Sequence, residues 1–371
     1  MKKILFLIIL YVQALVSFCQ YRERLKENTF DPSGFKNFFV EISFNKKDKI
    51  PELHYSTVRF IDARADTSKF GFAVAGSNNE YHRMLFSKPV SEYLSIKLNP
   101  LLSKKYDTTK GLNKNESLLF VINDLWLSQI IIPASFGKSM LTGPKDYLCF
   151  CYFSADCYLE NNNMLIRLGT IDTVVSLKKW IVMGADDLLK KTFLQVMSTA
   201  DSLLLYSSAD SETIIYEEMN TRLNTTYNIP ILKSPLNKGV YLTYQDFLAN
   251  KTIAEDFKII KDSKKEYIES QTYPDSVFTN AWGYSDGNEI FFHINEKYYR
   301  MVRSQNTFEL AGPRNISKFY GPGDKILNAS VATFFGGIAS GGISLILMGS
   351  DNQVMKELVP YQLNIKKGTI Y

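Results

Sequence analysis

The sequence is poor in the side chains that hold metals or build disulfide frameworks. It has three histidines and four cysteines among 371 residues, and no two cysteines have the Cys-x-x-Cys spacing of a zinc ligand pair. Cys149, Cys151 and Cys157 lie an even number of positions apart, so on a strand they would share one face and act as small apolar residues. We therefore expect no metal site and no other cofactor.

The sequence also lacks a long block of like charge. Its 43 Lys and Arg residues nearly balance its 38 Asp and Glu residues, which gives no electrostatic support for a nucleic-acid partner. Residues 137–139 read Gly-Lys-Ser, but the first glycine of a phosphate-binding loop would fall at Ile132. No nucleotide partner is expected. A serine-hydrolase triad is not expected either, because the histidines lie on separate segments, and we predict a protein that is not an enzyme.

The N-terminus has the three parts of a bacterial secretory signal peptide. Lysines at residues 2–3 precede the apolar run Ile4–Val16, which is too short to span a membrane. Residues 1–19 are therefore predicted to be removed on export to the periplasm or cell envelope. The alternative is a lipoprotein acylated on Cys19, but Phe18 stands where such a signal normally has Gly or Ala.

The first half of the mature chain mixes strand and helix patterns. The predicted strands cover residues 38–44, 56–62, 118–127, 147–159 and 164–177. Residues 160–163 read Glu-Asn-Asn-Asn and predict a tight hairpin turn between the last two strands. Helices are predicted from Pro89, with an interruption at Pro100, and from Asp186 or Asp187 to Leu205. An N-terminal α+β domain over residues 20–208 follows.

One short motif carries a resemblance to a known group. The strand ending in Val58–Arg64, with its Asp-x-Arg signature, is followed by a helix, an apolar strand, a hairpin and a closing helix. This order resembles the auxiliary envelope lipoproteins of ABC-type transport systems over about half the chain. The resemblance implies an accessory role at a membrane. The chain departs from that group in its signal cleavage site.

The second half of the chain predicts a small antiparallel sheet. A polar stretch at residues 209–229 is expected to be a linker or bridging helix. Residues 238–250 read as a strand running into a helix capped by Thr243, and residues 277–310 as a β-meander with its strongest turn signal at Asp286-Gly287. Residues 239–310 resemble a module of uncharacterised exported bacterial proteins, and that resemblance implies no activity.

Residues 326–350 form a stretch without a single charge. As a helix they would be long enough to cross a bilayer, and Gly336, Gly337, Ser340 and Gly341 would give that helix a flat face for close helix packing. The segment is predicted as a glycine-rich transmembrane helix with a tail at residues 351–371. The alternative is a buried hairpin or helix of the second domain, because residues 361–365 alternate like a strand that needs a partner.

Two groups of residues are candidates for a site. Asp62, Arg64 and Asp66 alternate at a strand end, where they could form an acid–base cluster or a structural ion pair that fixes a loop. The aromatic residues Trp282, Tyr284 and Tyr298 could form a contact surface for a glycan or peptide.

These patterns predict an α+β protein of two domains, with a C-terminal β-meander domain over residues 230–325. The leading hypothesis is a non-catalytic envelope protein, an accessory or assembly subunit with membrane and envelope protein partners. The first alternative is a soluble periplasmic or secreted binding module for a glycan or peptide. The second alternative, a hydrolase that uses Asp62 and Asp66, has the least support.

Overall fold

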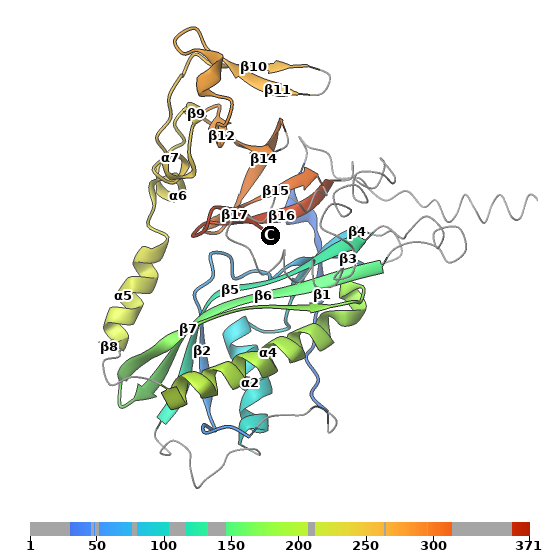
Figure 1. Ribbon diagram of the computed structural model, residues 1–371, viewed down its shortest axis with the longest axis vertical. Coiled ribbons are helices and arrows are strands. Elements are labelled where there is room, and N and C mark those ends of the chain that lie inside the picture. Colours follow the sequence, from blue (N-terminus) through green and yellow to red (C-terminus); the bar gives the residue numbers. More distant parts are fainter. Residues whose placement is uncertain are drawn as a thin grey trace, which may run out of the picture.

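A computed structural model of the chain shows an α+β fold dominated by sheets (Figure 1). It describes residues 30–45, 48, 52–75, 80–103, 116–132, 146–206, 212–262, 265–294, 296–313 and 358–371. The predicted signal peptide with Cys19 lies outside the described residues. So does the predicted glycine-rich segment 326–350, which contains the four small residues of the expected packing face.

The first large sheet has five strands in the order β2-β5-β6-β7-β8. The strands are β2 (Val58–Asp62), β5 (Glu116–Ile132), β6 (Asp146–Asn161), β7 (Met164–Leu177) and β8 (Thr213–Ile215). β2 runs parallel to β5, and the other neighbours are antiparallel. Asn162 and Asn163, with φ of 47° and 68°, form the two-residue turn between β6 and β7, as a type I′ hairpin requires. The predicted hairpin is confirmed.

Two helices pack on one face of this sheet, α2 (Val90–Leu102) and α4 (Ile181–Tyr206). α4 begins earlier than predicted because Ile181 and Ala185 are buried against the sheet. Pro100 falls in the last turn of α2 and does not interrupt it. Cys149, Cys151 and Cys157 lie on this helix-covered face as free, buried thiols, and burial raises their pKa values to about 11, 12 and 12.

A three-stranded sheet joins the edge of the five-stranded one. Its order is β1 (Lys36–Phe39), β4 (Glu80–Leu85) and β3 (Phe72–Ala75), preceded by the short helix η1 (Pro32–Gly34). The junction lies just before β3, where Leu127 of β5 donates its backbone N–H to the Phe70 carbonyl at 2.7 Å. Gly71 forms a bridge to Leu127, and its φ of +155° suits glycine.

The polar stretch after α4 proves to be a bridging helix. β8 still belongs to the five-stranded sheet, so that sheet extends past the boundary predicted at residue 208. α5 (Tyr216–Thr226) follows β8 directly and leads to the short helix α6 (Pro230–Lys233). Figure 1 shows α5 running from the first sheet towards the second.

The second large sheet has seven strands, all antiparallel to their neighbours. In spatial order they are β17 (Thr369–Ile370), β16 (Leu358–Asn364), β15 (Thr307–Pro313), β14 (Lys297–Ser304), β13 (Ile290–Ile294), β12 (Gly283–Ser285) and β9 (Gly239–Tyr241). Gly287, Glu296 and Gln305 have positive φ in the turns. The predicted meander is confirmed, and the C-terminal strands extend it.

Both faces of the β9–β14 part of this sheet are covered. α6 and α7 (Tyr244–Leu248) pack on one face, and Thr243 caps α7 together with Asp246 in a capping box, as predicted. The hairpin of β10 (Lys258–Lys261) and β11 (Glu266–Glu269), with the short helix η2 (Asp275–Val277), covers the other face. Residues on both faces of these strands are therefore buried.

The pairing of β15 with β16 corrects the predicted C-terminal tail. Pro313 pairs with Leu358, and the Tyr361 hydroxyl donates to the Pro313 carbonyl at 3.0 Å. The two ends of residues 314–357 are therefore adjacent strand ends of one sheet. A single membrane crossing between them would separate strands that are hydrogen-bonded, so the predicted one-pass topology does not fit. Among the described residues, no helix has both the length and the apolar character of a membrane span.

Gly71→Ala should weaken the junction between β3 and β5. A Cβ at residue 71 would lie 2.5 Å from the Leu127 carbonyl oxygen, so the backbones must move apart, and we expect a loss of about 1–3 kcal/mol in the free energy of unfolding measured with urea. Gly34→Ala is the matched control, since nothing lies within 4 Å of its added Cβ. Equal stability of the two variants would contradict this account of the junction.

Candidate functional site at the seam between the two large sheets

Buried polar side chains concentrate where the seven-stranded sheet rests on the first part of the chain. We call this contact the polar seam. It consists of residues 62–69 and 123–124 on one side and residues 304–309 and 362–367 on the other. In Figure 1, β15–β17 lie directly above β5. The backbone takes part in the contact, because Asn306 donates its N–H to the Ala65 carbonyl at 3.0 Å.

Arg64 fixes the loop that follows β2. Its guanidinium forms a fork with Asp62, with Nε to Oδ1 at 2.7 Å and Nη2 to Oδ2 at 2.8 Å. Nη1 donates to the Lys69 carbonyl at 2.7 Å. This bidentate pairing is the strong form of an arginine–carboxylate contact. The predicted cluster therefore divides: Arg64 pairs with Asp62, and Asp66 has other partners.

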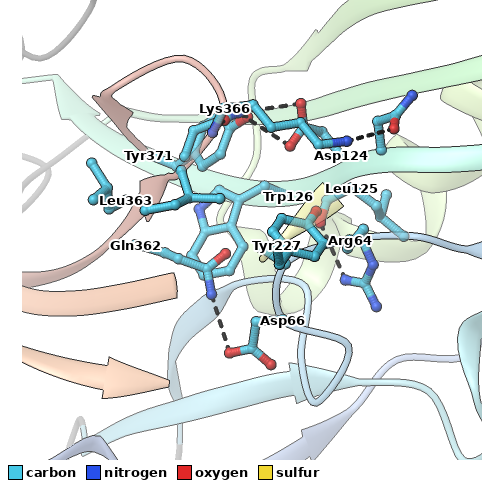
Figure 2. A pocket seen from close by; sticks show the side chains of 14 residues that line it. Arg64, Asp66, Asp124, Leu125, Trp126, Tyr227, Gln362, Leu363, Lys366 and Tyr371 are labelled. Atoms are coloured by element: carbon cyan, nitrogen blue, oxygen red, sulfur yellow. Dashed lines mark hydrogen bonds between the residues drawn. The ribbon is translucent and has the colours of Figure 1, made fainter. Parts of the chain in front are cut away.

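Asp66 is a fully buried and fully engaged carboxylate. Its Oδ1 accepts from the Ser68 N–H at 2.8 Å and from the Ser68 hydroxyl at 2.6 Å. Its Oδ2 accepts from Ser304 at 2.8 Å and is paired with Lys69. The same oxygen accepts from Gln362 at 3.2 Å (Figure 2). Burial acts to raise the pKa of Asp66, but the Lys69 charge and the hydrogen bonds outweigh it and hold that pKa below its ordinary value.

Lys69 is shared between two carboxylates from opposite sides of the polar seam. Its Nζ is paired with Asp66 of its own loop and with Glu309 of β15, and all three side chains are at most 2% exposed. The ammonium also lies 5.7 Å from the centre of the Phe72 ring. Within the described part of the chain, neither oxygen of Glu309 accepts a well-aligned hydrogen bond. Burial raises the pKa of Glu309, and Lys69 offsets only part of that effect.

A bulge in β5 makes the second contact of the polar seam. The register shifts between Ile122 and Asp124, which aims Asn123 and Asp124 at the seven-stranded sheet. The Asn364 amide donates to the Asp124 carboxylate at 3.1 Å, and Lys366 Nζ donates to Asn123 at 2.8 Å. Burial lowers the pKa of Lys366. Two separate polar contacts therefore hold the sheets in one orientation.

The space left between these contacts is small. A cavity of about 20 Å³ lies among Arg64, Asp124, Trp126, Tyr227 and Lys366 (Figure 2). A volume of that size admits one water molecule, whereas small-molecule sites are more than tenfold larger. The Tyr227 ring at the cavity wall is held in place by its hydroxyl, which donates to the Ala63 carbonyl at 2.8 Å. The geometry suits a packed contact between the two sheets and not a substrate pocket.

Of the three aromatic candidates of the meander, two are buried and one is partly buried. Trp282 is partly buried and stacks on Phe247 with ring centres 4.1 Å apart. Tyr284 and Tyr298 are 9% and 6% exposed and meet edge to face at 5.0 Å. The prediction of a contact surface built from these rings was wrong, because β10, β11, α6 and α7 cover both faces of their strands.

Residues 283–287 read Gly-Tyr-Ser-Asp-Gly and so match the Gly-x-Ser-x-Gly pattern of a hydrolase nucleophile. Their structure differs from that motif, which needs a strand followed by a helix with the serine exposed. Ser285 ends β12, is 0% exposed, and accepts the Gly287 N–H at 3.0 Å inside a turn to β13. The match is therefore a hairpin signal. Among the described residues, no group of three acidic, His or Cys side chains could hold a metal ion.

Comparison with known proteins adds no assignment. No protein-family model matches the chain, and no curated protein sequence is significantly similar to it. The polar seam is therefore interpreted from its own geometry.

Lys69→Met should be one of the most damaging single substitutions in the chain. It leaves the buried Asp66 carboxylate without its cation, and removing one partner of a buried ion pair costs about 3–5 kcal/mol. Lys88→Met is the matched control, because Lys88 and Glu92 form a pair in which both side chains are 49% exposed, and such pairs contribute about 0–1 kcal/mol. Urea unfolding at neutral pH measures both changes. A similar small loss for both variants would contradict the role given to Lys69.

Proposed function

We propose that the chain is a non-catalytic exported protein of the bacterial cell envelope that acts as an accessory or assembly subunit at the membrane. In this proposal it has two domains joined rigidly by the polar seam. The main observation in its favour is that the residues best suited to catalysis are already paired with other side chains of the polar seam. Asp62 is held by Arg64, and Asp66 is fully buried with all its partners inside the seam.

The hydrolase alternative conflicts with this arrangement. A carboxylate that acts as a general acid or base must reach a bound substrate directly or through one water. The Asp66 side chain is 0% exposed, and the adjacent cavity has room for one water only. The geometry therefore favours a structural role for Asp62, Arg64 and Asp66.

Membrane contact from one side fits the strand pairing better than a span does. Residues 326–350 carry no charge and have small residues at helical spacing, which supports association with lipid or with another helix. The pairing of Pro313 with Leu358 holds both ends of residues 314–357 together. We therefore propose that residues 314–357 meet a membrane or a membrane protein from the side of the sheet on which Pro313 and Leu358 lie.

A soluble binding module for a glycan or peptide remains the second candidate. One observation favours it. Met164 of β7 pairs with Ile215 of the edge strand β8, and the two residues are 47% and 52% exposed. An edge strand with exposed apolar side chains is a site where an extended peptide can add.

Replacing residues 314–357 by a short Gly/Ser turn should release the protein from membranes. Because Pro313 and Leu358 are cross-strand partners, a turn of about two to five residues can join them without breaking the sheet. We expect the full chain to remain with membranes after carbonate extraction and the shortened chain to be soluble, with an unchanged near-ultraviolet circular dichroism spectrum.

The matched control shortens residues 133–145 in the same way, since Ile132 and Asp146 are also cross-strand partners. This control should remain with the membranes. Recovery of the full chain in the soluble fraction would overturn the membrane proposal and make the soluble binding module the leading account.

Asp62→Asn should change stability and not activity. The substitution removes the charge that holds Arg64, and losing a charged hydrogen-bond partner costs about 1.5–3 kcal/mol. We expect the purified wild type and variant to show the same absence of turnover on chromogenic esters, glycosides and phosphates. Turnover by the wild type that a folded Asp62→Asn variant lacks would overturn the non-catalytic assignment.

A further inference from the structure

We propose that the polar seam is a proton-operated clasp, in which the Glu309 carboxyl carries a proton while the two sheets are in contact and loses it as the pH rises, which loosens the contact. This inference goes beyond the proposed function and does not depend on it. It rests on the charges, burial and hydrogen bonds of three side chains.

The charges of the buried triad do not balance when both acids are ionised. Lys69 supplies one positive charge, while Asp66 and Glu309, whose side chains are 0% exposed, would supply two negative charges. A buried charge without compensation is so costly that the group is neutralised instead. One of the two carboxyl groups must therefore hold a proton in the closed seam over a wide range of pH.

The hydrogen bonds decide which group holds that proton. The carboxylate of Asp66 accepts from Ser68, Ser304 and Gln362 in addition to Lys69, and donors of this kind stabilise the ionised form. Glu309 has Lys69 and the Ser304 hydroxyl beside it. However, the single Ser304 proton is donated to Asp66 at 2.8 Å, and neither Glu309 oxygen accepts a well-aligned hydrogen bond from the described residues. Glu309 is therefore the group that is protonated, and the directions of the two pKa shifts agree with this.

The other charges around Glu309 are already paired. On β14, Val302 lies directly opposite Glu309, and Arg300, two positions along that strand, is paired with Glu289 at 2.6 Å. On β16, the residue opposite is the neutral Gln362.

On the side of the loop, Arg64 is committed to Asp62. β3 contributes the Phe72 ring beneath Lys69. In the described part of the chain, these elements therefore supply Lys69 as the cation that faces Glu309.

The direction of the pH effect follows from the raised pKa of Glu309. Its folded-state pKa is above the ordinary value of 4.5. Its contribution to the stability of the closed seam is therefore complete below pH 4.5 and is lost as the pH rises through the raised pKa. The pKa of Asp66 is lowered, so its contribution to stability is lost as the pH falls, and only near and below its ordinary pKa of 3.8. Above pH 4.5, Glu309 is therefore the acid of the triad whose titration changes the stability of the closed seam. The equilibrium constant for opening the seam then rises by up to about tenfold per pH unit until Glu309 is ionised in the closed seam.

Difference infrared spectroscopy of the full chain tests the proton directly. We expect a protonated-carboxyl C=O band that persists above pH 4.5, that Glu309→Gln abolishes and that the control Glu92→Gln, at an exposed site, retains. If the glutamine variant does not fold, wild type carrying ¹³C in its glutamate side-chain carboxyls replaces it. A band that shifts with the label supports the proposal, and the absence of a protonated glutamate band overturns it.

Hydrogen exchange tests the clasp. After correction for intrinsic rates, the opening constant of residues 63–70 and 304–312 should rise at least about tenfold above pH 4.5 in the wild type and in Glu92→Gln. In Glu309→Gln this rise should be absent. The same rise in Glu309→Gln, or no rise in the wild type, would show that the proton does not control the seam.

Discussion

The arrangement of the two large sheets depends on one buried ammonium group. Lys69 is removed from water, so the fold must surround it with acidic groups, and it does so with one carboxyl group from each side of the seam. An apolar contact between the sheets would tolerate sliding, whereas a shared cation fixes position and orientation. Ser68, Ser304 and Gln362 then complete the partners of Asp66. The stability of the seam and its specificity come from the same few side chains.

The two sheets prepare this meeting by local means. The Arg64 fork closes the loop after β2 so that Asp66 and Lys69 point towards β15, and the β5 bulge turns Asp124 towards Asn364. The seven-stranded sheet presents polar side chains at the same place because Glu309 and Gln362 are directly opposite each other on β15 and β16. A cavity with room for one water remains between these contacts.

Local patterns in the sequence were enough to predict the hairpins and the caps. The Asn162-Asn163 turn, the meander turns and the Thr243 cap each depend on residues within a few positions of one another. The partners of Lys69 were missed because Glu309 lies on a distant strand and no short motif joins them. The signal available was a glutamate inside the apolar strand Thr307–Pro313, since an acid buried there needs a cation.

Two further expectations needed information that one sequence does not contain. Whether Tyr284 and Tyr298 are exposed depends on what covers their strands, and the β10–β11 hairpin that does so precedes them in the chain without any pairing signal to them. The strand pattern of residues 361–365 was visible, but its partner β15 is separated from it by residues 314–357. The resemblances to exported and transport-associated proteins stay predictions.

The distance along the chain between the two sides of the seam has a consequence for the order of folding. Asp66 and Gln362 are 296 residues apart, and contacts that close so long a loop form late and slowly. The β6–β7 hairpin can form as soon as it is synthesised, but Lys69 stays without Glu309 until β15 is in place, and β16 completes the surroundings of Asp66 afterwards. The two halves therefore lock together only when the last strands of the chain are present, and until then Asp66 and Lys69 lack their partners from the seven-stranded sheet.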